Sequence, residues 1–115
     1  MIAGVYNFTI YQGATFSREI TVRDSDNDLF DFTNYTARMH IRAEIDSTET
    51  MVELTTENGM IELGGTDGTV TLTISSADTA SMSTDGVYDL EIINNGGRVD
   101  RLLKGAVTLD LEVTR

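Results

Sequence analysis

The chain has 115 residues, enough for one hydrophobic core, and we expect a single domain over residues 1–115. Nineteen acidic residues against eight Lys and Arg residues give a formal net charge of −11. This charge disfavours nucleic acids and anionic membranes as partners, because both are bound through Lys and Arg. Cysteine is absent, which excludes disulfides, zinc–thiolate sites and thiol catalysis. No stretch of about 20 apolar residues is present that would span a membrane.

The first three predicted strands follow from alternation of apolar and polar residues. Residues 6–11 form the first strand, with three apolar side chains on one face. Residues 16–22 form the second, in which Arg18 interrupts an otherwise apolar face. Residues 35–42 form the third, and their basic side chains lie on the face opposite the apolar ones.

The second half of the chain continues this pattern. Its predicted strands are residues 51–54, 59–63, 70–74, 87–93, 98–103 and 106–113. Asn95–Gly96 between two of them predicts a hairpin turn. Residues 76–82 are the one helical candidate, with Ser75 or Ser76 as the cap, and we expect this short helix to link one sheet to the other.

The spacing of these elements predicts the fold class. Eight or nine short strands at intervals of about 8–12 residues are typical of an all-β sandwich or barrel. One apolar face per strand indicates antiparallel sheets with a solvated side. The chain has no proline, a residue that often protects exposed sheet edges. We therefore expect the edges to be covered in another way, for example by a neighbouring subunit.

A basic group on the third strand is the main candidate site. Arg38, His40 and Arg42 alternate along it and are the one local concentration of basic residues in an acidic chain. A catalytic histidine needs a nucleophile and an orienting carboxylate within hydrogen-bond reach, and the sequence indicates neither. We interpret these three residues as a solvated or interface-forming face, and we expect no enzyme activity.

The segment 24–28 resembles the first half of a calcium-binding loop. Asp24, Asp26 and Asp28 supply oxygen ligands at its first, third and fifth positions. The loop then requires Gly at position six and Glu at position twelve, where this chain has Leu29 and Tyr35. We favour a plain acidic turn and expect no metal ion, cofactor or small-molecule substrate.

The order of strands and turns resembles a family of small tailed-phage and prophage virion proteins encoded among tail and baseplate genes. It is also similar, more loosely, to the N-terminal β-sandwich module of phage baseplate upper proteins. The likeness covers nearly the whole chain, including Gly-Val-Tyr-Asp-Leu-Glu at 86–91, and is carried by residues 6–16, 31–42, 54–59, 64–70, 86–91, 105–107 and 112–115. Family members commonly have Gly or Pro in the first long turn, where this chain has Asn27 and Asp28.

The resemblance implies an immunoglobulin-like sandwich that acts as a structural adaptor, in several symmetric copies, and has no catalytic residues. We therefore expect a tail, baseplate or fibre-attachment protein that binds other virion proteins and is assembled in the cytoplasm of a bacterial host. A capsid decoration protein is one alternative. A host-glycan-binding module is another, with Phe30 or Phe32 as the stacking aromatic, although we interpret Phe32 as a core residue. Head or tail position, copy number and the binding face stay open.

Overall fold

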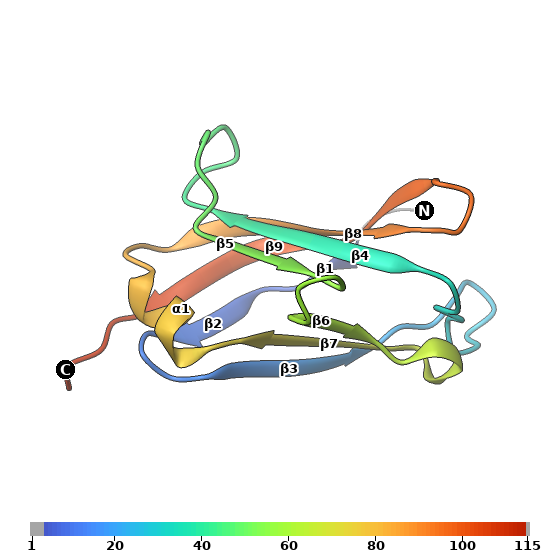
Figure 1. Cartoon of the computed structure of the whole chain (residues 1–115), viewed down its shortest axis with the longest axis horizontal. Coiled ribbons are helices and arrows are strands. Elements are labelled where there is room, and N and C mark those ends of the chain that lie inside the picture. Colours follow the sequence, from blue (N-terminus) through green and yellow to red (C-terminus); the bar gives the residue numbers. More distant parts are fainter. Residues whose placement is uncertain (1–3, 115) are drawn as a thin grey trace.

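Two β-sheets packed face to face make up the protein in the computed structural model, which describes residues 4–114 (Figure 1). Sheet A has six strands in the order β1-β9-β8-β4-β5, with β2 also paired to β9, and sheet B has the order β3-β7-β6. The prediction of an all-β, sandwich-like fold is confirmed.

The element boundaries agree broadly with the predicted segments. The elements are β1 (Gly4–Val5), β2 (Phe8–Tyr11), β3 (Phe16–Thr21), β4 (Thr36–Arg42), β5 (Val52–Thr55), β6 (Ile61–Leu63), the 3-10 turn η1 (Gly65–Asp67), β7 (Thr69–Ile74), α1 (Ser76–Ser81), β8 (Gly86–Ile93) and β9 (Val99–Asp110). The 3-10 turn η1 was not predicted.

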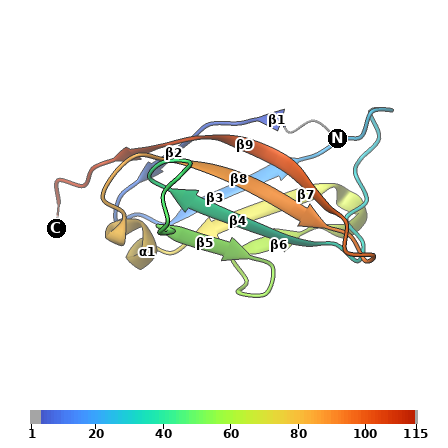
Figure 2. The ribbon, with the colours of Figure 1, turned by 90° about the horizontal axis from the view of Figure 1, so that it is seen from above.

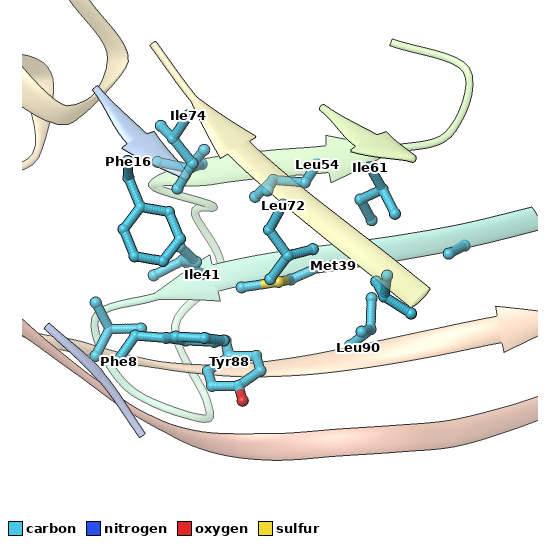
Figure 3. Packing of buried hydrophobic residues seen from close by; sticks show 14 of the residues in the cluster. Phe8, Phe16, Met39, Ile41, Leu54, Ile61, Leu72, Ile74, Tyr88 and Leu90 are labelled. Carbon is cyan, nitrogen blue, oxygen red and sulfur yellow. The ribbon is translucent and has the colours of Figure 1, made fainter. Parts of the chain in front are cut away.

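Both sheets contribute apolar side chains to one continuous core (Figure 3). Alternate residues of each strand point inward, such as Met39 and Ile41 of β4 against Leu72 and Ile74 of β7, all nearly inaccessible to solvent. Burying one such side chain stabilises the fold by roughly 1.5–3 kcal/mol. Phe32 is also buried, which confirms its predicted place in the core.

The N-terminal strands depart from the antiparallel prediction. Strands β1 and β2 pair with β9 in parallel, with Phe8 opposite Val107. The predicted strand 6–11 begins only at Phe8, because Tyr6 and Asn7 form the break between β1 and β2. The Asn7 side-chain Oδ1 accepts a hydrogen bond from the Ala106 amide at 2.9 Å. Strands β1 and β2 run in the same direction as β9 along one edge of sheet A.

A single long strand replaces the two that were predicted for residues 98–103 and 106–113. Strand β9 is continuous from Val99 to Asp110. Its pairing with β8 shifts register once, because Leu90 lies opposite Leu103 while Glu91 lies opposite Arg101. Leu102 is therefore an extra residue in β9, which is a β-bulge.

Gly105 allows the N-terminal strands to approach β9 closely. A Cβ atom at this position would lie 2.2 Å from the Tyr6 carbonyl oxygen. The Tyr88 hydroxyl donates a hydrogen bond to the same oxygen from within the core. These contacts hold Tyr6, which lies between β1 and β2, against β8 and β9 of sheet A.

The β8–β9 hairpin was predicted, but its turn is longer than Asn95–Gly96. The Asn94 amide donates to the Arg98 carbonyl at 3.0 Å, and the Asn94 side chain accepts bonds from the amides of Gly96 and Arg98. The left-handed residue is Gly97, with φ of 88°. A three-residue loop that ends in a left-handed glycine is a common hairpin type.

Helix α1 lies in the predicted segment and connects β7 of sheet B to β8 of sheet A. The Ser75 hydroxyl caps it by accepting a bond from the Asp78 amide at 3.2 Å. Thr79 is fully buried, and its hydroxyl accepts from the Gly13 amide and donates to the Ala14 carbonyl, which fixes α1 to the β2–β3 turn. In the part of the chain that the structure describes, no helix is long and apolar enough to cross a bilayer.

Candidate functional site: a charged face of sheet A

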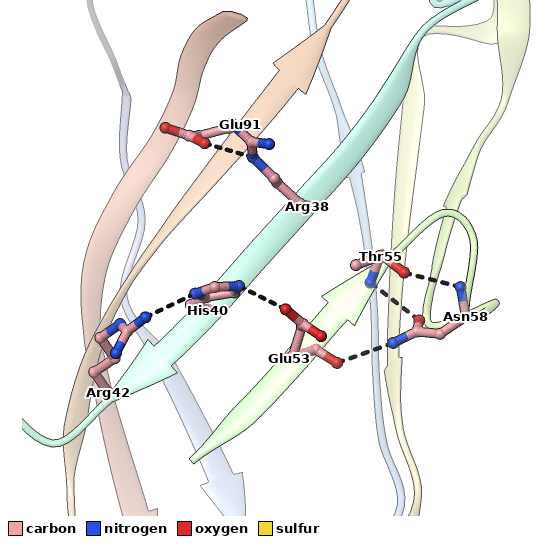
Figure 4. Close-up of polar contacts among 7 residues, drawn as sticks. All are labelled: Arg38, His40, Arg42, Glu53, Thr55, Asn58 and Glu91. Carbon is pink, nitrogen blue, oxygen red and sulfur yellow. Dashed lines mark hydrogen bonds and ion pairs between the residues drawn. The ribbon is translucent and has the colours of Figure 1, made fainter. Parts of the chain in front are cut away.

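The three basic residues predicted as an interface lie together on the outer face of sheet A. Strand β4 places Arg38, His40 and Arg42 on this face, because its intervening residues, such as Met39 and Ile41, enter the core (Figure 4). The period-two pattern of β4 was sufficient to predict their common orientation.

Neighbouring strands add further charges beside them. Glu53 of β5 lies opposite His40, and Asp89 and Glu91 of β8 lie opposite His40 and Arg38. Strand β9 adds Lys104 opposite Asp89 and Arg101 opposite Glu91. We call this set the charged face; its members are Arg38, His40, Arg42, Glu53, Asp89, Glu91, Arg101 and Lys104.

Ion pairs connect the charged face across its strands. Arg38 Nε lies 2.8 Å from Glu91 Oε1, and Arg101 Nε lies 3.5 Å from Asp89 Oδ2. These side chains are partly exposed, and exposed pairs of this kind stabilise a fold by only about 0–1 kcal/mol each. The pairs therefore order the side chains more than they stabilise the sandwich.

Both ring nitrogens of His40 are occupied. Arg42 Nη2 lies 3.1 Å from Nδ1, and Glu53 Oε2 lies 2.8 Å from Nε2. A guanidinium only donates hydrogen bonds, so Nδ1 accepts and Nε2 carries the proton that is donated to Glu53. In this arrangement His40 has no nitrogen left to take a proton from a nucleophile, although a carboxylate does orient its ring.

The contribution of β9 to the charged face could not be derived from alternation. Arg101 and Lys104 are three residues apart, so a regular strand would direct them to opposite faces. The bulge at Leu102 brings both onto the same face. Periodicity predicts side-chain direction only where the register is unbroken.

A hollow of about 430 Å³ lies at one end of the charged face, and we call it the sheet A hollow. Its charged lining is Arg42, Arg101, Lys104 and Asp89, and its apolar lining includes Val5 and Ile45. Ile45 is 92% exposed and belongs to the β4–β5 loop, which stands away from the outer side of sheet A (Figure 1). The hollow thus combines an apolar surface with a net positive charge.

Charge is distributed unevenly over the molecule. The charged face carries four of the eight Lys and Arg residues and three of the nineteen acidic residues, so its net charge is +1 with a neutral histidine. The remaining sequence has sixteen acidic residues and four Lys and Arg residues, a net charge of −12. The face is therefore a local exception on a strongly acidic protein.

The aspartates of segment 24–28 form a turn through their own hydrogen bonds. Asp24 Oδ1 accepts bonds from the amides of Asp26 and Asp28 at 2.9 and 3.0 Å, and Asn27 adopts a left-handed φ of 64°. Among residues 4–114, no group of three His, Cys, Asp or Glu side chains is placed to hold a metal ion.

The two aromatic candidates for glycan stacking lie in the interior or against it. Phe32 is buried, and Phe30 packs against both Phe32 and Tyr35, with ring centroids 4.7 and 5.6 Å away. Beside them, the hydroxyl and amide of Thr33 donate to Asp31, and these bonds lower the pKa of that carboxyl. This region is a packed turn whose aromatic rings are already in contact with one another.

The fold and the charged face are the observations from which a function is proposed below. No family model and no curated protein matches this sequence.

Proposed function

We propose that this chain is a non-enzymatic protein-binding module and a structural component of a phage virion, acting as a tail or baseplate adaptor. The resemblance of its sequence to small tail and baseplate proteins motivates the virion assignment. Its partners would be other virion proteins, and several symmetric copies would be present in one particle.

The charged face is the observation that carries the protein-binding part of this proposal. Its net charge of +1 contrasts with −12 on the remaining sequence. Arginine is enriched among the residues that contribute most at protein interfaces, and the buried centre of an interface is more apolar than the surrounding surface. A partner surface with acidic and apolar groups would be complementary to this face.

The strand order supports an immunoglobulin-like classification within this proposal. Strands β3, β7 and β6 correspond to B, E and D of that fold, and β4, β8 and β9 correspond to C, F and G, with β5 beside β4 as in the variable type. Such sandwiches expose faces and edges for docking without needing an active site. The occupied nitrogens of His40 agree with a non-enzymatic role.

The proposal is tested by incorporation into particles. Quantitative mass spectrometry of purified virions should find the protein at a fixed copy number, and its absence would refute the virion assignment. Lys104→Glu, which reverses the charge on the rim of the sheet A hollow, should reduce incorporation. Arg98→Glu is the matched control, since Arg98 lies in the hairpin turn off the charged face. Equal incorporation of the two variants would contradict the role of the face.

A further inference from the structure

Strand β3 forms an open edge of the sandwich. It pairs with β7 in unbroken antiparallel register from Phe16 opposite Ile74 to Thr21 opposite Thr69. Within residues 4–114, β7 is its only strand neighbour. The strand has six residues, no proline and no bulge, so the charged side chains of Arg18 on its inner face and Glu19 on its outer face are its only features that protect a sheet edge.

The open side of β3 presents three residues with backbone groups available for pairing. The Val22 amide donates to the Gly68 carbonyl at 2.7 Å, which places Val22 in a hydrogen-bonded pair directed toward β7. Because these pairs alternate along an antiparallel ladder, the N–H and C=O groups of Ser17, Glu19 and Thr21 point to the open side. We call these three residues the β3 edge.

The β5 edge of sheet A differs from the β3 edge. On β5 the outward backbone groups belong to Glu53 and Thr55, and the side chain of Asn58 bonds both of them (Figure 4). Its Oδ1 accepts from the Thr55 amide, and its Nδ2 donates to the Glu53 carbonyl, each at 3.0 Å. The amide of Asn58 thus takes the place of a neighbouring strand, and no comparable side chain covers the β3 edge in the described part of the chain.

An apolar hollow lies beside the β3 edge, between the two sheets. It has a volume of about 620 Å³, and we call it the β3 hollow. Its apolar lining is Gly4, Ile20, Val22, Phe30, Leu102 and Leu103, and its polar lining is Thr21, Arg23, Asp24 and Ser25, whose two charges are opposite. In Figure 2, β9 and β1 of sheet A extend beyond β3, so that this part of sheet A has no strand of sheet B opposite it.

Arg18 closes the other end of the same opening. Its guanidinium donates to the Tyr6 hydroxyl at 2.9 Å and lies 5.5 Å from the ring centroid of Phe16. This contact explains why a basic residue occupies the inner face of β3. The gap between the sheets is therefore filled near Phe16 and left open near Ile20 and Val22.

We propose that the β3 edge accepts an extended segment of another protein, in which apolar and basic residues alternate. The segment would add a fourth strand to sheet B, with main-chain bonds to Ser17, Glu19 and Thr21 and with alternate apolar side chains entering the β3 hollow. Strand addition of this kind draws affinity from the backbone and specificity from the pockets. The site is separate from the charged face, so it does not depend on the function proposed for that face.

Charge complementarity selects a basic segment. Glu19 is the charged member of the β3 edge, and Glu62 lies on the same outer face of sheet B across Thr71. A Lys or Arg opposite Glu19 would form a favourable cross-strand pair, whereas like charges there are destabilising. A second copy of this chain would bring another Glu19 and a net charge of −11, so self-pairing at this edge is disfavoured.

The test uses short synthetic peptides and amide hydrogen exchange measured by NMR on the full chain. The probe is a peptide of alternating Lys and Val; its controls are a peptide of the same composition with the valines grouped together and a peptide of alternating Glu and Val. The alternating Lys–Val peptide should slow exchange of the Ser17, Glu19 and Thr21 amides by at least about tenfold. Neither control peptide should protect these amides.

Three variants locate the effect. Thr21→Pro removes an outward N–H group that sheet B does not use and should abolish the protection. Glu19→Lys should weaken binding of the Lys–Val peptide and favour the Glu–Val peptide. Glu62→Lys is the matched control, because it makes the same charge change on the same face two strands away from the edge, and it should retain most of the protection.

Several outcomes would overturn the proposal. Equal protection by the grouped or acidic peptide would show that the binding is not strand addition by a basic segment. Slow exchange of the three amides in the free protein at low concentration would mean that the chain covers its own edge. Protection that appears with protein concentration, together with a dimer in sedimentation, would make a second copy the occupant.

Discussion

The two sheets differ in how their edges are completed. At one edge of sheet A, Asn58 bonds the Thr55 amide and the Glu53 carbonyl of β5, and at the opposite edge the N-terminal strands are attached to β9 around Gly105. Sheet B has an open edge along β3, beside an apolar hollow. The same chain thus caps the β5 edge with a side chain and leaves the β3 edge available for pairing.

The outer faces of the two sheets differ in their charged side chains. Sheet A presents long charged side chains joined by ion pairs, such as Arg38 with Glu91. The outer face of sheet B has small polar residues on β7 and its charges are acidic, at Glu19 and Glu62. The charged face of sheet A and the β3 edge of sheet B are therefore the two surfaces for which we propose partners.

Disrupting the close approach of Tyr6 to Gly105 should have the largest effect on stability. In Gly105→Ala the new Cβ would lie 2.2 Å from the Tyr6 carbonyl oxygen, and backbone has little freedom to move there. We expect a loss of about 2–4 kcal/mol in the free energy of unfolding, measured by urea denaturation. Gly96→Ala is the control, since its Cβ would meet only the Asn94 side chain at 3.4 Å. Similar losses in both variants would contradict this account.

Removing the Asn58 side chain should come next. Asn58→Ala leaves the Thr55 and Met60 amides and the Glu53 carbonyl without their side-chain partner, and we expect a loss of about 1–2 kcal/mol. The exposed β5 edge should also promote association, seen by sedimentation as the protein concentration rises. Asn95→Ala, at a hairpin residue whose side chain bonds no described residue, should change neither quantity.

The hydroxyl of Tyr88 should contribute less to stability than these groups, and its contribution should depend on pH. Burial, and secondarily the nearby Tyr6, raises the pKa of Tyr88 above its ordinary value. The unfolded chain releases this proton near pH 10 while the folded protein keeps it, so its contribution is complete below about pH 10 and is lost as pH rises further.

Tyr88→Phe should therefore destabilise the protein by about 1 kcal/mol at neutral pH, because the Tyr6 carbonyl loses its donor. It should also make the alkaline decline in melting temperature shallower. Tyr11→Phe, at an exposed tyrosine, should leave the decline unchanged. A decline as steep in Tyr88→Phe as in the wild type would refute this explanation.

The open edge should show the smallest change in stability. Thr21→Pro removes no hydrogen bond within sheet B, so we expect a change of at most about 0.5 kcal/mol in the free energy of unfolding. A loss as large as that of Gly105→Ala would mean that the β3 edge is already paired within the fold. Thermal denaturation of the two variants side by side would decide this.

Local patterns in the sequence were sufficient for much of the fold. Alternation in β4 predicted that Arg38, His40 and Arg42 share a face, because side-chain direction along a regular strand depends only on neighbouring residues. The Asn and Gly residues near position 95 predicted the β8–β9 hairpin for the same reason, since turn conformation is set locally. Phe32 was also placed correctly in the core.

Only the tertiary structure decided which strands are neighbours. The bulge at Leu102 turns Arg101 and Lys104 onto one face, and this depends on the pairing of β9 with β8. The N-terminal strand joins sheet A in parallel with β9, which leaves β3 with β7 as its single strand neighbour among residues 4–114. Strand pairing is a contact between residues far apart in the chain, so alternation within a segment determines its faces but not its partners.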